Sequence, residues 1–301
     1  ISARGDQTDD SAPWQGLLAW LEAPQRQWLE RLQLRPQEWD APVLDLDPLE
    51  LQERQRAALL REQLPAEALE PTGAGAMPDW GLLSRGRGLL PPGAAGELER
   101  QGLEQRWRSL QACLEQLGPG ERRPVAWNGL AADLPWHGGH VVLVHTARPR
   151  TPQRLRLWGE LLLACAAGLA PDGAALVGRD GPRFRVLEQL QAPSAAEAGP
   201  LLEQLLAWSH GHRHSCWPLP PLTGWAFASG ETAKPGQGRG WSLAASTWEG
   251  GHQQPAERRE AVQALCFGAD LPLSALLTPE RQQLALALHR PLLERRTELK
   301  R

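Results

Sequence analysis

Apolar residues between positions 120 and 180 fall into short runs separated by turn residues. Pro124 to Trp127 and Leu130 to Leu134 are joined by Asn128-Gly129, a pair that readily takes the positive φ angles of a tight hairpin turn. We therefore predict two antiparallel strands. Val141 to Val144 is apolar without alternation, which is typical of a strand that is buried on both faces.

Two segments around these strands show helical spacing. Residues 154–167 place apolar side chains three and four positions apart and end before Gly168, which favours a helix C-terminus. Residues 97–117 form a second apolar stripe that stops at Gly118-Pro119. With a fourth strand at residues 174–177, the predicted order is αβββαβ.

Capping signals predict further helices on both sides of this core. Asp47 precedes a proline and an acid in the manner of an N-cap, and Ser194 begins a capping box. Thr278 begins a third helix, in which Pro291 predicts a kink or a break. The predicted fold class is α+β (α/β), an αβββαβ core with additional N- and C-terminal helices.

The chain divides where its composition changes. Residues 65–96 are rich in glycine and proline and are typical of a connector. We predict an N-terminal helical region with this connector over residues 1–92. Residues 93–301 would then form the α/β core and its C-terminal helical extension.

The αβββαβ order resembles that of the restriction-endonuclease-like nucleases. Those enzymes hold a divalent metal with carboxylates on the second and third strands, and a lysine two residues beyond the second acid polarises the attacking water. No frame between Val144 and Arg148 contains a carboxylate, and Asp133 is the only acid in the hairpin. The only lysines are Lys234 and Lys300, outside the core. We interpret the core as a nuclease scaffold without catalytic residues, although topology alone leaves a generic α+β domain open.

Several segments of the chain form a recognisable order. They are a helix, a proline and a second helix at residues 17–34, then 44–50, 88–97, 156–168, 218–221 and 291–293. Taken in this order, they resemble the C-terminal region of the exodeoxyribonuclease V gamma subunit family, the RecC family. There are departures: Leu49 replaces a phenylalanine of the family pattern, and Glu160 or Leu161 replaces a histidine. Ala23 stands where iron-sulfur members of the wider group have cysteine, so that cluster is not expected.

The resemblance implies a non-catalytic domain of a bacterial RecBCD-type helicase-nuclease that acts in double-strand break repair and recombination. RecB-like and RecD-like subunits would supply ATP hydrolysis and cleavage. This domain would dock a helicase subunit and guide strands from double-stranded DNA ends and single-stranded DNA. Two other hypotheses remain open: an autonomous metal-dependent DNA nuclease that uses Asp133 with acids of residues 97–104, and a protein scaffold that never touches DNA.

Four arginines follow the third strand, next to where DNA lies in catalytic relatives. Arg148, Arg150, Arg154 and Arg156 are the candidate phosphate contacts, with a solvated face or a subunit interface as the alternatives. The net charge of −3 gives no global sign of nucleic-acid binding, so any DNA contact must be local.

Other candidate chemistry is weaker. Residues 210–216 alternate three histidines with Cys216, which could bind zinc but is more typical of a loop. Trp127 and Trp136 could stack on bases, although core packing is the more common role. The four cysteines form no CxxC pair, and no apolar run reaches the ~20 residues of a membrane span. We expect no cofactor, no metal and no membrane contact, a cytoplasmic location, and, because the chain begins at Ile1, a fragment of a longer polypeptide.

Overall fold

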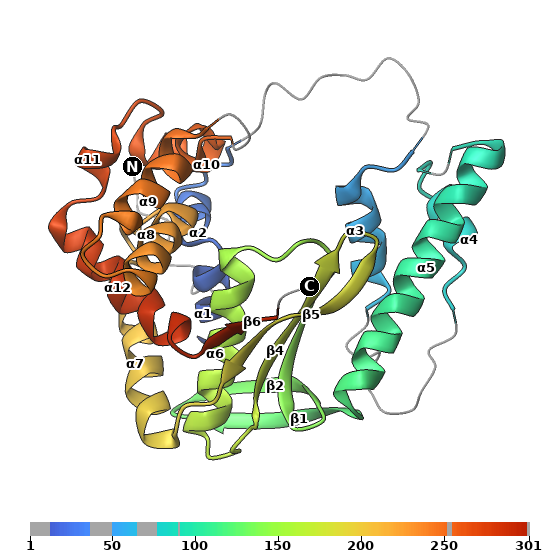
Figure 1. The fold of residues 1–301 in the computed structure, drawn as a ribbon, viewed down its shortest axis with the longest axis horizontal. Helices are drawn as coiled ribbons and strands as arrows, with labels where there is room; N and C mark the ends of the chain where they lie inside the picture. The colour runs from blue at the N-terminus through green and yellow to red at the C-terminus, as the bar shows by residue number, and fades with distance from the viewer. Residues whose placement is uncertain (1–12, 37–49, 65–76, 90, 252–254, 300–301) are drawn as a thin grey trace, which may run out of the picture.

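The computed structural model describes residues 13–36, 50–64, 77–89, 91–251 and 255–299. It contains a mixed sheet with helices on both faces (Figure 1). The strands are β1 (Gly120–Trp127), β2 (Leu130–His137), β3 (His140–His145), β4 (Gly173–Asp180), β5 (Arg183–Gln191) and β6 (Arg296–Glu298). The helices are α1 (Pro13–Glu22), α2 (Pro24–Arg31), α3 (Glu53–Glu62), α4 (Trp80–Arg85), α5 (Gly93–Leu117), α6 (Thr151–Ala166), α7 (Ala195–Gly211), α8 (Pro221–Ala233), α9 (Arg239–Glu249), α10 (Ala261–Phe267), α11 (Leu273–Leu276) and α12 (Pro279–Leu293). A 3₁₀ turn, η1, spans Glu257–Arg259.

The sheet follows the chain order from β1 to β6. All neighbouring strands are antiparallel except β3 and β4, which are parallel and are joined through α6. The predicted hairpin is confirmed, because Asn128 and Gly129 both have positive φ angles, 42° and 81°, between β1 and β2. The α5-β1-β2-β3-α6-β4 order confirms the predicted αβββαβ core and the α+β class.

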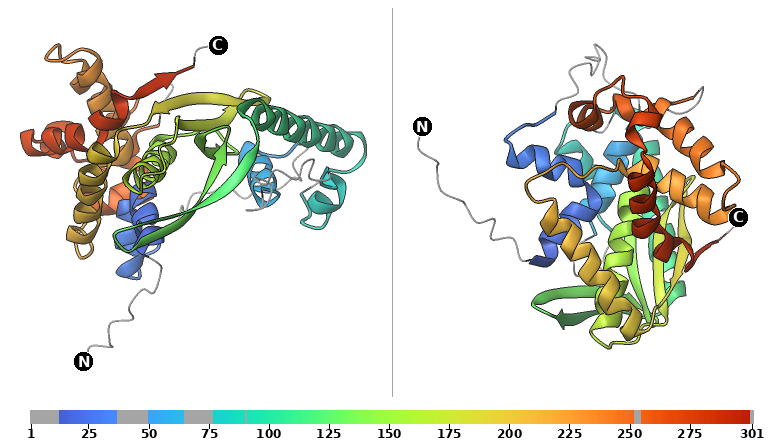
Figure 2. Two further views of the ribbon diagram at one scale, coloured as in Figure 1. Left: turned by 90° about the horizontal axis from the view of Figure 1, so that it is seen from below. Right: turned by 90° about the vertical axis from the view of Figure 1, so that its left-hand side faces the viewer.

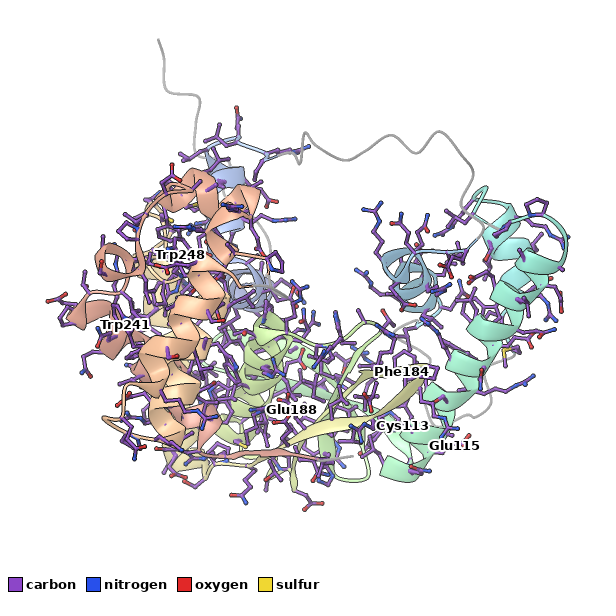
Figure 3. All side chains as sticks on the ribbon, turned by 45° about the horizontal axis from the view of Figure 1, so that its top comes forward. Cys113, Glu115, Phe184, Glu188, Trp241 and Trp248 are labelled. Carbon is purple, nitrogen blue, oxygen red and sulfur yellow. The ribbon has the colours of Figure 1, made fainter. Side chains whose placement is uncertain are left out.

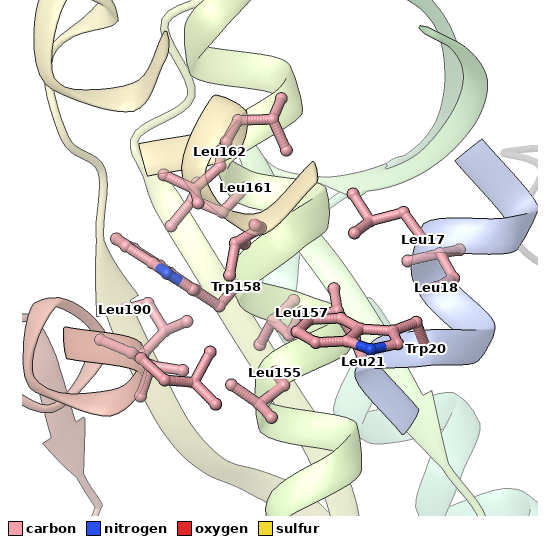
Figure 4. Packing of buried hydrophobic residues seen from close by; sticks show 14 of the residues in the cluster. Leu17, Leu18, Trp20, Leu21, Leu155, Leu157, Trp158, Leu161, Leu162 and Leu190 are labelled. Atoms are coloured by element: carbon pink, nitrogen blue, oxygen red, sulfur yellow. The ribbon is translucent and has the colours of Figure 1, made fainter. Parts of the chain in front are cut away.

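Each face of the sheet contributes to its own hydrophobic cluster. The first cluster joins Val141 and Leu176 to α6, α1, α7 and the C-terminal helices. Figure 4 shows Leu17 and Trp20 of α1 turned toward Leu157 on α6. The second cluster joins Val142 and Val177 to α3, α4 and α5. Along β3 and β4, successive apolar side chains therefore enter opposite clusters. This is why an uninterrupted apolar run is typical of a central strand that is buried on both faces.

The hairpin of β1 and β2 departs from the rest of the sheet. β2 pairs with β3 only at Trp136 with Val141 and at His137 with His140. Beyond these pairs the hairpin contacts α1 and α6, and Figure 2 shows it reaching from the α5 side of the molecule to α1. Trp136 is 1% exposed in the first cluster, so core packing, and not base stacking, is its role.

Two helix boundaries differ from the sequence prediction. Asp47 lies outside the described residues, but Glu50 is not helical, and α3 begins at Glu53 after Gln52. The side chain of Gln55 accepts a hydrogen bond from the Gln52 backbone N–H at 2.7 Å, which caps the helix later than expected. The helix α12 does not break at Pro291, because the proline falls in its last turn, and the helix ends at Leu293.

The boundary between residues 1–92 and 93–301 stays a prediction. Helices from the first of these segments pack on both faces of the sheet, since α1 joins the first cluster and α3 joins the second. The glycine- and proline-rich connector contains α4, in which Trp80 packs edge-on against Trp107 of α5 with ring centroids 5.7 Å apart. Within the described residues, no helix has both the length and the apolar character of a membrane span.

Candidate nucleic-acid interface

The end of β3 determines whether a nuclease-type metal site could form. Val142 and Val144 belong to the face of the second cluster, and Thr146 follows on the same face. Thr146 is 3% exposed, and its hydroxyl donates a hydrogen bond to the carbonyl oxygen of Ala57 in α3 at 2.7 Å. The side chain at this position therefore holds α3 to the strand end.

Asp133 faces the same side of the sheet as Val144 and Thr146. Its neighbour Leu134 belongs to the first cluster, so alternation along β2 directs Asp133 to the opposite face. The structure thus selects Val144-x-Thr146 as the frame in which a nuclease would carry its second acid and its lysine. Asp133 is paired instead with Arg122, whose Nε lies 3.1 Å from Oδ2. A divalent cation needs several oxygen ligands. This position offers one carboxylate, which is already bound to a guanidinium, together with a valine and a buried threonine, so it does not fit such an ion.

Most of residues 210–216 lie in the expected loop, which begins after the end of α7. His210 is in the last turn of α7, and His212 caps that helix and accepts or donates a hydrogen bond with Ser215 Oγ at 3.1 Å. Among the residues that the structure describes, no group of three or more histidine, cysteine or acidic side chains is placed to hold a metal ion.

Arg148 and Arg150 lie in the loop between β3 and α6. Both are exposed, and neither has an ion-pair partner in the described part of the chain. Arg150 is the N-cap residue of α6, where its backbone N–H donates to the side chain of Gln153 at 2.9 Å. The backbone of this loop is therefore fixed, while the two guanidinium groups remain available to an anion.

Arg154 and Arg156 are engaged with acids of the same chain. Arg154 is paired with Glu188 on β5 at 2.5 Å. Arg156 is paired with Glu22 at 2.9 Å and with Glu160 at 3.0 Å. These two arginines connect α6 to its surroundings, whereas Arg148 and Arg150 do not.

Glu188 is the centre of a network that the sequence interpretation missed. Burial would raise the pKa of Glu188, but hydrogen bonds from Arg154 and Arg296 outweigh it and hold the pKa below its ordinary value. The guanidinium carbons of both arginines lie 5.2 and 5.6 Å from the ring centroid of Trp225 on α8. Figure 3 places Glu188 and Phe184 apart on β5, with Phe184 beside Cys113 of α5. The alternation of polar and apolar residues in 183–187 was the available signal for β5.

The β3–α6 loop forms one wall of a groove of about 830 Å³. Much of the remaining lining comes from α8, α9 and η1, with Trp225, Thr247 and Glu257. His145 lies at the end of β3 in this groove, and burial, followed by the nearby charge of Arg61, lowers its pKa. The positive charge of the groove at neutral pH therefore comes from arginine and not from histidine.

A mixed sheet with an αβββαβ core and flanking helices defines an α+β domain, the class expected from the sequence. The family model for the RecC C-terminal domain matches residues 11–232. The chain therefore belongs to the RecC C-terminal domain family, and this membership indicates a component of a RecBCD-type complex, exodeoxyribonuclease V. A comparison of the sequence with curated proteins gave no match.

Proposed function

We propose that this chain is a non-catalytic part of a RecBCD-type helicase-nuclease that acts in double-strand break repair and recombination. In this role it docks RecB-like and RecD-like subunits and guides DNA strands that those subunits unwind and cut. The observation that carries the proposal is the strand end of β3, where Val144 and Thr146 occupy the acid and lysine positions of a nuclease.

The arginine loop supports the DNA-guiding part of the proposal. Phosphate contacts need guanidinium groups that are exposed and free of competing carboxylates. Arg148 and Arg150 meet this requirement. Arg154 and Arg156 add positive charge near the loop, but their ion pairs make positioning of α6 their main contribution.

A cleavage assay tests the non-catalytic role. The full-length protein, without its partner subunits, is incubated with magnesium or manganese and with single- and double-stranded DNA. We expect no cleavage above that of a protein-free control. Reproducible cleavage that is lost in Asp133→Ala would overturn the proposal in favour of an autonomous metal-dependent nuclease, because Asp133 is the only acid on the relevant face of the β1–β2 hairpin.

Assembly and DNA binding are tested separately. Affinity purification of the full-length protein should recover helicase subunits in a defined stoichiometry. In that complex, Arg148→Glu with Arg150→Glu should weaken DNA binding without changing assembly. The control is Arg239→Glu, an exposed arginine at the first position of α9 that is not among the residues lining the groove. Unchanged DNA affinity in the double variant would favour a scaffold that does not touch DNA.

A further inference from the structure

Cys216 and Cys266 are far apart along the chain, but their side chains are hydrogen-bonded to each other. Cys216 lies in the loop between α7 and α8, and Cys266 lies in the last turn of α10. Both side chains are partly exposed. The other two cysteines, Cys113 and Cys165, are buried in separate hydrophobic clusters. The fold therefore brings together the two thiols that solvent can reach.

Contacts with α2 hold both cysteines in this arrangement. The buried side chain of Gln25 in α2 donates hydrogen bonds to the carbonyl oxygens of Trp217 and Leu219, at 3.1 and 2.9 Å. The helix α10, which carries Cys266, packs against the same helix (Figure 1). The loop that contains Cys216 and the helix that contains Cys266 thus share one support, so their proximity does not depend on the thiol contact alone.

The surroundings make Cys266 the more reactive thiol of the pair. The hydrogen bond from Cys216 lowers the pKa of Cys266, and the same bond, together with burial, raises the pKa of Cys216. The thiolate is the form of cysteine that attacks an oxidant. Burial raises the pKa of Cys113 and raises that of Cys165 to about 11, so these two thiols stay protonated.

We propose that Cys266 and Cys216 are a site of reversible oxidation and form a disulfide when the protein meets hydrogen peroxide. The Cys266 sulfur attacks one peroxide oxygen, the O–O bond breaks, and a sulfenic acid and one water result. The Cys216 sulfur then attacks the sulfenic sulfur, the S–O bond breaks, and a second water leaves with the Cys216 proton. Two thiols lose two electrons, and one peroxide becomes two waters.

The disulfide would join parts of the chain that non-covalent contacts now connect. In η1, Glu257 accepts hydrogen bonds from the backbone N–H groups of Leu222 and Thr223 at the start of α8. The helix α10 follows η1 directly. A bond from Cys266 to Cys216 would attach the other end of this η1–α10 segment to the loop that leads into α8. Opening of the segment away from α8 should then become rarer.

Peptide mapping of the full-length protein tests whether the bond forms. The reduced protein is treated with hydrogen peroxide, remaining thiols are alkylated in denaturant, and tryptic peptides are analysed without reductant. We expect a linked pair of residues 214–239 and 260–281 that disappears after treatment with dithiothreitol. Cys113 and Cys165, the internal controls, should be recovered alkylated. No linked pair, or equal oxidation of Cys113 or Cys165, would overturn the proposal.

Serine variants test the order of the two steps, because dimedone traps the sulfenic acid that forms first. In Cys216→Ser, the dimedone adduct should form at Cys266. In Cys266→Ser, the adduct at Cys216 should be about fivefold less abundant, since Cys216 is the less acidic thiol. The two variants are matched controls for each other. Equal adduct yields would overturn the assignment of Cys266 as the thiol that is attacked first.

Amide hydrogen exchange measures the effect of the bond on the η1–α10 segment. Oxidation of the wild type should slow exchange in residues 261–267 about fivefold, and the same treatment of Cys266→Ser should leave it unchanged. Equal exchange in the oxidised and reduced wild type would overturn the claim that the bond holds this segment. None of these measurements requires helicase subunits or DNA, so the inference and the proposed function can fail independently.

Discussion

Arg154 and Glu188 form a bidentate ion pair between the first turn of α6 and β5. Arg154 Nη2 lies 2.5 Å from Glu188 Oε1, and Arg154 Nε lies 3.0 Å from Glu188 Oε2. Arg296 of β6 binds the same carboxylate at 2.7 Å, so one acid compensates two guanidinium groups. The side chains of Arg154 and Arg296 are only 18% and 17% exposed, which makes the acid necessary for both.

Glu188→Gln should therefore be strongly destabilising. The variant leaves Arg154 without its counter-charge and Arg296 with only the exposed Glu298. Loss of one partner of a buried pair costs about 3 kcal/mol. Urea denaturation at pH 7 measures the change in the free energy of unfolding. The matched control is Glu298→Gln, which removes a 70% exposed partner of the same Arg296 and should change stability by less than about 0.5 kcal/mol. Equal losses in the two variants would show that the network is not a stabilising centre.

Thr146→Val tests the connection between the strand end and α3. Valine has nearly the same shape but cannot donate to Ala57, so the variant should lose about 1 kcal/mol of stability. Amide hydrogen exchange should also become faster in α3, because the buried hydroxyl is one of the contacts that hold this helix against β3. Unchanged exchange in α3 would contradict this role. Ser109→Ala, which removes a bond to Phe184 of β5, controls for a general loss of stability.

The protonation of Glu257 should make stability depend on pH. Burial raises its pKa from 4.5 to about 7, and the hydrogen bonds from α8 only partly oppose this. Because the folded pKa is above the unfolded value, the contribution of Glu257 is greatest below pH 4.5 and is lost as the pH rises to 7. At 1.36 kcal/mol per unit the loss is about 3 kcal/mol. Glu257→Gln should remove this slope.

The comparison of the wild type with Glu257→Gln is made by urea denaturation at pH 5, 6, 7 and 8. The difference between their free energies of unfolding should change across the lower three values and level off above pH 7. Parallel curves for the two proteins would exclude a titrating group at this position.

The sequence predicted the parts of the fold that are determined locally. The Asn128-Gly129 turn, the apolar run in β3 and the stripe of α5 each act within a few residues, and all were identified. The strand β5 was missed although residues 183–187 alternate in polarity. The strand β6 was missed because it has three residues and forms only by pairing with β5, which is distant in sequence. Helix boundaries near prolines also depended on side-chain contacts and were placed less accurately.

The candidate site was predictable only in part for the same reason. The absence of an acid and a lysine around Val144 is a property of the sequence and could be established without a register. Arg154 is paired, whereas Arg150 has no ion-pair partner in the part of the chain that the structure describes. This distinction depends on Glu188, 34 residues from Arg154 along the chain. Likewise, nothing in the sequence indicated that Trp225 and Glu257 would line the same groove as the arginine loop.

His289 should limit stability in acid. It lies in α12, is 1% exposed, and neither ring nitrogen has a hydrogen-bond partner among the described residues. Burial lowers its pKa from 6.5 to about 3, so the neutral ring is the folded form. Because the folded pKa is depressed, the contribution of His289 is complete above pH 6.5 and is lost as the pH falls below that value.

His289→Leu should therefore stabilise the protein in acid relative to the wild type. Leucine fits the apolar surroundings near Leu155 and Trp217 and cannot bind a proton. Between pH 6.5 and pH 4 the wild type should lose about 3 kcal/mol more than the variant, at 1.36 kcal/mol per unit. Urea denaturation at pH 7, 5.5 and 4 measures the difference between the two free energies of unfolding. The titration of Glu257 affects both proteins equally and therefore cancels from this difference. Equal acid sensitivity would mean that His289 gains a proton without unfolding, through water that reaches its ring.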